Sequence, residues 1–176
     1  MNQLVQSTIV ESIRDFKLPS YEAIPNVGLY LEQTTRFIAD YLAPLENLSI
    51  TGTMIANYVK KGLISNPVKK QYNREQIAYL FFIAVAKSVL SLENIQLLLT
   101  LQRNTYDTKT AYDYFCQEFQ NVLNHVFGLR DSLDAVTARN SGEKTMLRNT
   151  IIAVAHKVYL EKCFTVMQQS EEPGSV

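Results

Sequence analysis

The side chains best suited to binding a ligand lie together in residues 49–74, SITGTMIANYVKKGLISNPVKKQYNR. This segment holds five basic residues and no acidic one: Lys60, Lys61, Lys69, Lys70 and Arg74. The whole chain has a net charge of zero, so the remaining residues carry an excess of acidic side chains. A local positive patch on an acidic body is typical of a protein that binds nucleic acid at a defined site. The alternative is a solvated surface that merely lacks acidic residues.

The first half of this segment has the pattern of a short helix over about 52–61. Thr51 precedes it as a predicted N-cap, because its hydroxyl can accept a hydrogen bond from a free backbone amide of the first turn. Gly62 follows it, where a left-handed C-terminal cap belongs. The helical spacing predicts an inward face and an outward face. The inward residues are Ile55, Tyr58 and Val59, and the outward ones are Thr53, Ala56, Asn57, Lys60 and Lys61.

The second half of the segment connects this helix to the next one. Asn66-Pro67 indicates a turn, and we expect the residues around it to pair as a small two-stranded wing over about 65–72. Asn73 and Gln76 have the spacing of a capping box for a following helix over about 73–90. That helix is apolar on nearly every side, which is typical of the centre of a domain.

The rest of the chain also favours helices. It has only six glycines and five prolines, and the long stretches with apolar periodicity contain neither. Besides the two helices above, we expect helices over about 4–16, 29–42, 92–102, 108–127 and 144–167, and an extended loop over 18–28. The predicted organisation is a domain over 1–102, a helical dimerisation or regulatory region over 103–169, and a disordered tail over 170–176.

Other kinds of chemistry have little support in the sequence. There is no nucleophile, base and acid pattern, no phosphate-cradling glycine loop and no carboxylate pair on one helix face, so we do not expect an enzyme. Cys116 and Cys163 match no metal or redox spacing, and His125 and His156 lie in apolar surroundings, so no metal or cofactor is expected. The longest apolar run, residues 77–86, is too short to cross a membrane. With no signal pattern at the N-terminus, we expect a cytoplasmic protein.

The patterns in the first hundred residues resemble two known families. The stretch from 51 to 95 is similar to the winged helix-turn-helix of MerR-type regulators: Tyr58, Gly62, Leu63 and Ile64 match the end of the recognition helix, Tyr72 matches the wing tyrosine, and SLENI (91–95) matches the last turn. More specifically, IPNVGLYLEQT, ITGTMIANYVKKGLI and NPVKKQYNREQIAYL resemble the bacterial domain-of-unknown-function family 1836 over about 18–101. The resemblance implies an all-α fold, with a MerR-like winged helix-turn-helix followed by a C-terminal helical hairpin.

The resemblance implies a transcriptional regulator that binds double-stranded DNA. Thr53 and Asn57 are the candidate base contacts, and Lys60, Lys61, Lys69, Lys70 and Arg74 the candidate phosphate contacts. Many MerR-type proteins have Arg-Tyr where this chain has Ala56-Asn57, and arginine in the wing where it has Lys70, so guanine recognition by arginine is not expected. The full set of candidate DNA-binding residues is Thr51, Thr53, Asn57, Tyr58, Lys60, Lys61, Lys69, Lys70, Tyr72 and Arg74. For Tyr58, packing beneath the wing is the alternative.

Partner predictions follow from the C-terminal helices. Their apolar stripes are broad, and a homodimer would bury them. Tyr106, Tyr112, Tyr114 and Tyr159 could line a pocket for a small-molecule effector, although core packing or a dimer interface also accounts for them. Two further readings stay open: a protein interaction module on a helix-turn-helix scaffold, and a small-ligand sensor.

Overall fold

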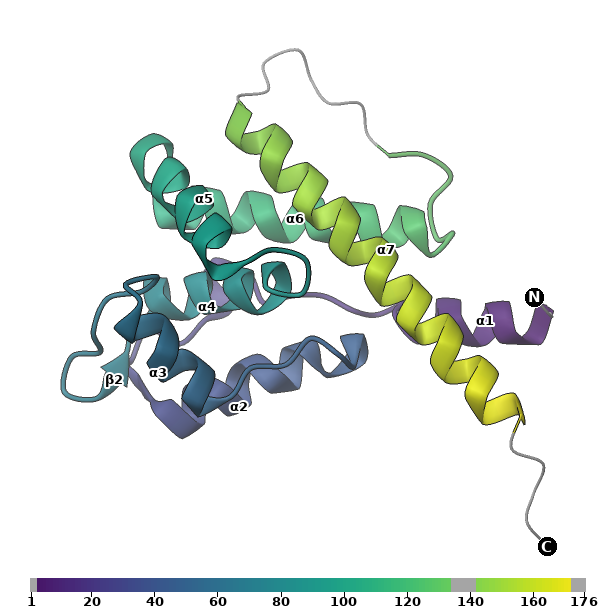
Figure 1. The fold of residues 1–176 in the computed structure, drawn as a ribbon, viewed down its shortest axis with the longest axis horizontal. Helices are drawn as coiled ribbons and strands as arrows, with labels where there is room; N and C mark the ends of the chain where they lie inside the picture. Colours follow the sequence, from purple (N-terminus) through teal and green to yellow (C-terminus); the bar gives the residue numbers. More distant parts are fainter. Residues whose placement is uncertain (1–2, 134–141, 172–176) are drawn as a thin grey trace, which may run out of the picture.

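The computed structural model describes residues 3–133 and 142–171, which are mostly helical with one two-stranded antiparallel sheet (Figure 1). The elements in chain order are α1 (Gln3–Glu11), the 3₁₀ turn η1 (Tyr21–Ala23), β1 (Leu29–Tyr30), α2 (Leu31–Leu42), the 3₁₀ turn η2 (Ala43–Leu45), α3 (Gly52–Lys60), β2 (Gln71–Tyr72), α4 (Arg74–Ala86), α5 (Leu92–Thr105), α6 (Thr108–Val126) and α7 (Gly142–Glu171). Within these residues, no helix is both long enough and apolar enough to span a lipid bilayer.

Several helix ends form as their local sequence predicts. The Thr51 hydroxyl accepts a hydrogen bond from Met54 N at 3.2 Å and begins α3. Asn73 and Gln76 form the predicted capping box at the start of α4, with hydrogen bonds of 2.9 and 2.8 Å. Ser91 caps α5 by accepting from Asn94 N. These caps confirm the predicted starts of three helices.

The sheet forms, but with a different strand partner from the one expected. β1 pairs with β2, with Leu29 opposite Tyr72 and Tyr30 opposite Gln71. The prediction that 29–42 is entirely helical is therefore wrong at its first two residues, since Tyr30 is extended and α2 begins at Leu31. Within the predicted wing, Val68 and Gln71 form only an isolated bridge. Residues 29–30 form a strand because they pair with residues 71–72, which are distant in the sequence. Local periodicity does not reveal such a pairing.

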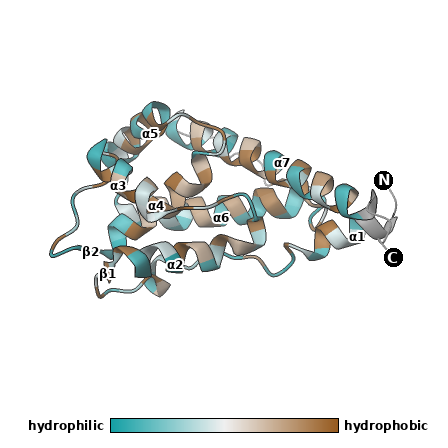
Figure 2. Ribbon diagram, turned by 60° about the horizontal axis from the view of Figure 1, so that its bottom comes forward, coloured by the Kyte–Doolittle hydropathy of each residue, from teal (hydrophilic) through white to brown (hydrophobic). Residues whose placement is uncertain are grey.

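The core is continuous and is centred on α4. Ile77, Leu80, Phe81 and Ile83 are fully buried there, as the apolar pattern on all sides of this helix predicts. α2, α6 and α7 all pack against α4. Each of these helices carries hydrophobic residues (Figure 2), and some of them are buried on every one of these helices.

The apolar stripes of the last two helices are buried inside the same chain. α6 packs against both α4 and α7, and α7 also packs against α1 and α5. The Phe82 and Phe115 rings meet edge to face at 5.5 Å between α4 and α6. The core thus crosses residue 102, where the sequence predicts a boundary. α7 reaches Glu171, beyond its predicted end, and the rest of the predicted tail lies outside the described residues.

The elements that carry the basic segment lie together. β1, β2 and α3 occupy one end of the molecule, and α1 and the last turns of α7 occupy the other (Figures 1 and 2). The loop that joins α3 to β2 projects from the first end (Figure 1).

Candidate nucleic-acid interface

α3 divides into a buried face and an exposed face. Ile55 and Tyr58 are buried, whereas the outward residues predicted from the sequence are all exposed: Thr53, Ala56, Asn57, Lys60 and Lys61. Thr51, the N-cap, is exposed as well, although its hydroxyl is engaged by the backbone of the first turn. The exposed face therefore combines small polar side chains at its start with two lysines at its end.

The end of α3 is fixed by backbone geometry. Gly62 has a φ of 75° and donates to Val59 O, while Leu63 N donates to Tyr58 O at 2.9 Å. This pair of hydrogen bonds is the Schellman motif, which needs a left-handed residue and usually has glycine there. Leu63 then enters the core, so the chain turns sharply towards the projecting loop.

The projecting loop ends in a tight hairpin made of two lysines. Val68 and Gln71 exchange backbone hydrogen bonds of 3.1 and 2.9 Å, and the residues between them are Lys69, with φ 50°, and Lys70, with φ 65°. Positive φ at both central residues is the signature of a type I′ turn, for which Asn-Gly is preferred. Two lysines in this conformation cost on the order of 1 kcal/mol each. Both side chains are exposed, so core packing does not account for them.

Two of the predicted contact residues lie in the core. Tyr58 is 3% exposed and Tyr72 is 5% exposed, and burial raises the pKa of both hydroxyls. Tyr72 also pairs with Leu29 in the sheet. Both rings therefore hold α3 and β2 in place and are poorly accessible to a ligand at the surface, which favours the packing alternative for Tyr58.

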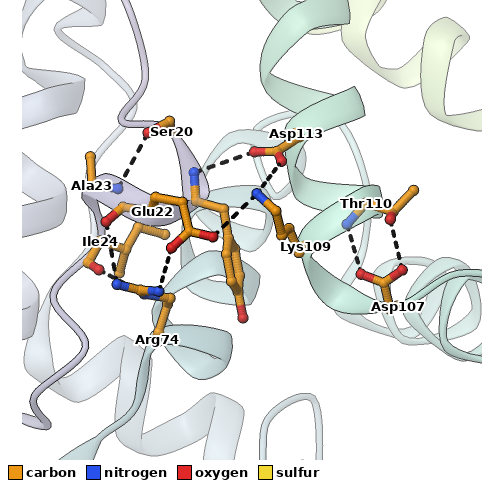
Figure 3. Close-up of polar contacts among 10 residues, drawn as sticks. Ser20, Glu22, Ala23, Ile24, Arg74, Asp107, Lys109, Thr110 and Asp113 are labelled. Atoms are coloured by element: carbon orange, nitrogen blue, oxygen red, sulfur yellow. Dashed lines mark hydrogen bonds and ion pairs between the residues drawn. The ribbon is translucent and has the colours of Figure 1, made fainter.

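Arg74 is also engaged within the chain (Figure 3). Its Nε donates to Ile24 O at 2.8 Å, and its Nη1 forms an ion pair with Glu22 Oε2 at 2.8 Å. The guanidinium lies over the Tyr21 ring, with its carbon 5.5 Å from the ring centre. The side chain is only 19% exposed. Arg74 therefore ties the loop 18–28 to the start of α4, and we remove it from the candidate phosphate contacts.

The same loop is tied to α6. Glu22 also pairs with Lys109 at 3.3 Å, and Lys109 pairs with Asp113 at 3.0 Å (Figure 3). Asp113 Oδ1 in turn accepts a hydrogen bond from Tyr21 N at 3.3 Å. The loop thus connects the first turn of α4, which follows β2 in the sequence, to the first two turns of α6.

Two residues of α5, Arg103 and Glu93, also contact the basic segment, and neither is in the predicted set. Arg103 of α5 donates to Leu63 O at 2.7 Å and lies over the Tyr79 ring at 4.6 Å, which holds the chain just after Gly62. Glu93 forms an exposed ion pair with Lys61 at 3.6 Å. Its pKa is lowered by its own backbone amide, by the Ser91 hydroxyl and by Lys61. Neither contact has a local sequence signal, since each partner comes from a distant helix.

The fold and this surface define the class: a mostly helical protein with a small antiparallel sheet and an exposed basic helix and hairpin at one end. A family model described as "Domain of unknown function (DUF1836)" matches residues 19–115, more than half of the chain. The chain belongs to this family. The match begins before η1 and ends inside α6. Searches of curated proteins and of solved structures gave no significant match.

Proposed function

We propose that this protein is a transcriptional regulator that binds duplex DNA, and that residues 29–105 act as a MerR-like winged helix-turn-helix. In this proposal α2 and α3 are the helix-turn-helix and the 63–72 loop with its lysine hairpin is the wing. One observation carries the proposal: α3 and the hairpin are both exposed at the same end of the molecule. Together they present four lysines.

The exposed start of α3 suits contact with base edges. Thr53 and Asn57 are four residues apart, so they lie on the same face of the helix. The side-chain amide of asparagine can bond adenine N6 and N7 together in the major groove. Thr51 lies at the same end, where the free amides of a helix N-terminus favour a phosphate.

The lysines suit contact with phosphates. Lys60 and Lys61 extend from the end of α3, and Lys69 and Lys70 from the hairpin. Such contacts position a protein on DNA without reading sequence. The strained backbone at the hairpin supports a role for these two side chains, because a residue in a sparsely populated conformation is a reason to suspect function.

A homodimer completes the proposal. With the inner stripes of α6 and α7 already covered, we propose the outer face of α7 as the dimer surface. Leu160, Phe164 and Met167 are 52%, 58% and 48% exposed and recur at steps of four and three residues. A dimer formed through a two-fold axis would present two copies of α3 to a palindromic site.

The test compares two variants with the same change in net charge. K69E/K70E reverses the hairpin lysines, and R14E/K17E reverses exposed charges elsewhere. We expect the first to weaken binding to labelled genomic duplex by at least tenfold in fluorescence anisotropy, and the second to change it by less than twofold. Four phosphate contacts per protomer would contribute about −3.6 to the slope of log K against log salt, or about −7.2 for the dimer.

Two outcomes would contradict the proposal. One is no binding to any genomic duplex at low salt. The other is an equal effect of K69E/K70E and R14E/K17E. If the protein regulated its target genes in cells without binding any genomic duplex, the protein interaction module would be the better account of this surface.

A further inference from the structure

A cavity of about 140 Å³ lies between α4, α5, α6 and the first turns of α7. Its walls are almost wholly apolar and aromatic, with Tyr79, Phe82, Leu98 and Phe115 among them. The charged side chains that line it, Glu143 and Lys144, both belong to the α7 side. No residue of α3 or of the 63–72 loop contributes, so the cavity is separate from the proposed DNA surface.

Two buried polar atoms of wall residues have no hydrogen-bond partner among the described residues: Gln102 Oε1 and the Tyr112 hydroxyl. The Gln102 side chain donates through Nε2 to Tyr106 O at 2.8 Å, which fixes the orientation of its amide. Its Oε1 is buried and meets no hydrogen-bond donor in residues 3–133 and 142–171. Buried acceptors in proteins are normally paired, so an unpaired one on a residue that lines a cavity points to a missing donor.

Aromatic rings form much of the cavity wall. Lys144 Nζ lies 5.5 Å from the centre of the Tyr106 ring and 5.1 Å from that of Tyr114, which links both rings to the start of α7. Three of the four tyrosines suggested by the sequence for an effector pocket line the cavity: Tyr106, Tyr112 and Tyr114. The fourth, Tyr159, instead packs edge to face on Phe127 at 5.2 Å.

We propose that this cavity binds a single-ring aromatic molecule that carries one O–H or N–H donor, as in the phenol and aniline class. The volume sets the size, since an apolar protein cavity of about 150 Å³ holds one benzene ring. The aromatic wall favours a ring that can meet it edge to face. The Gln102 Oε1 atom accepts the donor of the ligand and fixes its orientation. The inference does not depend on DNA binding.

The first test is calorimetric titration of the full chain with phenol and with toluene, which differ by the donor. We expect saturable one-site binding of both, with phenol about tenfold tighter because its hydroxyl pairs with the buried acceptor. The Q102L variant should keep toluene binding and bring the two affinities to within about twofold of each other.

The second test fills the cavity. A111F from α6 and, independently, L98W from α5 should each abolish binding of both ligands, while A39F, a matched change at an exposed position of α2, should leave it intact. Circular dichroism identifies a filling variant that fails to fold. In that case, ligand binding by the other filling variant tests the proposal. The proposal is overturned by the absence of saturable binding in the native chain. It is equally overturned by binding that survives in a folded filling variant, or by a phenol preference that persists in Q102L.

Discussion

At the scale of single residues, we expect the lysine hairpin to lower the stability of the fold while it strengthens DNA binding. Lys69 and Lys70 hold left-handed backbone that Asn-Gly would adopt with less strain. In K69N/K70G we expect the free energy of unfolding to rise by about 1 kcal/mol, and duplex binding to weaken. Urea denaturation and fluorescence anisotropy measure the two effects.

The matched control for this prediction is K69A/K70A. It removes the same charges but keeps residues with a Cβ at both left-handed positions, so binding should weaken equally without a gain in stability. If both variants bound duplex like the native protein, the hairpin would have no part in binding.

A second residue-scale prediction concerns alkaline pH. Tyr112 is buried between α4 and α6, and burial, followed by the nearby Cys116 thiol, raises the pKa of its hydroxyl above the ordinary value for tyrosine of about 10. Burial likewise raises the pKa of the Cys116 thiol from 9.0 to about 12. These groups ionise in the unfolded chain first, so the stability that they contribute is complete below about pH 9 and falls as the pH rises towards 12.

Urea denaturation between pH 8 and pH 10.5 should therefore show a falling free energy of unfolding, with each such group adding up to about 1.4 kcal/mol per pH unit. In Y112F the fall above pH 10 should be shallower, because phenylalanine does not ionise. Superimposable pH profiles for Y112F and the native protein would show that Tyr112 is not protected from ionisation in the fold.

At the scale of elements, Arg74 joins the 18–28 loop to α4 through Ile24 O and Glu22. We expect R74A to lower the free energy of unfolding by about 2 kcal/mol, because it leaves a buried carbonyl without its charged donor. The control R14A breaks an exposed ion pair with Glu11 and should cost less than about 0.5 kcal/mol. Urea denaturation compares the two variants.

The same R74A variant tests the role assigned to Arg74 in binding. If its guanidinium serves only the fold, the folded variant should keep the native slope of log K against log salt. If the slope were smaller in magnitude by about 0.9, the contribution of one phosphate contact, Arg74 would be a DNA contact after all.

The elements that the sequence predicted are those with local signals. Thr51, Asn73 and Ser91 begin helices by bonding amides three residues later, and Gly62 ends α3 through its own backbone freedom. Such contacts depend on neighbours in the chain, so their spacing reveals them.

The features that escaped prediction depend on distant partners. Leu29 and Tyr30 become a strand because β2 lies beside them, and Arg74 is held by residues about 50 positions earlier. Tyr72 looks like a surface contact in the family pattern, but its burial depends on how the sheet is covered, whereas the burial of Tyr58 follows from its place on the inward face of α3. The exposed positions of α3 were predicted because they follow directly from helical periodicity.

At the scale of the whole molecule, the outer face of α7 is the candidate surface for the homodimer. We expect sedimentation velocity to show a dimer for the native chain at micromolar concentration, and L160E/F164E to shift it to monomer, because buried carboxylates without partners oppose association. The control Q96E/N104E adds the same charge at exposed polar positions of α5, away from the outer face of α7, and should stay dimeric. A native chain that is monomeric at all concentrations would contradict the homodimer.

An aromatic stack inside α6 crosses the end of the segment that matches the family model. The match to DUF1836 ends at residue 115, yet the Phe115 and Phe119 rings stack at 5.8 Å across that border, and Phe119 is fully buried. A fragment cut at the border would lose this stack, the rest of α6 and all of α7, and would leave α4 uncovered along the surfaces that they occupy. The segment that the family model matches is thus smaller than the continuous hydrophobic core, which extends to Cys163 in α7.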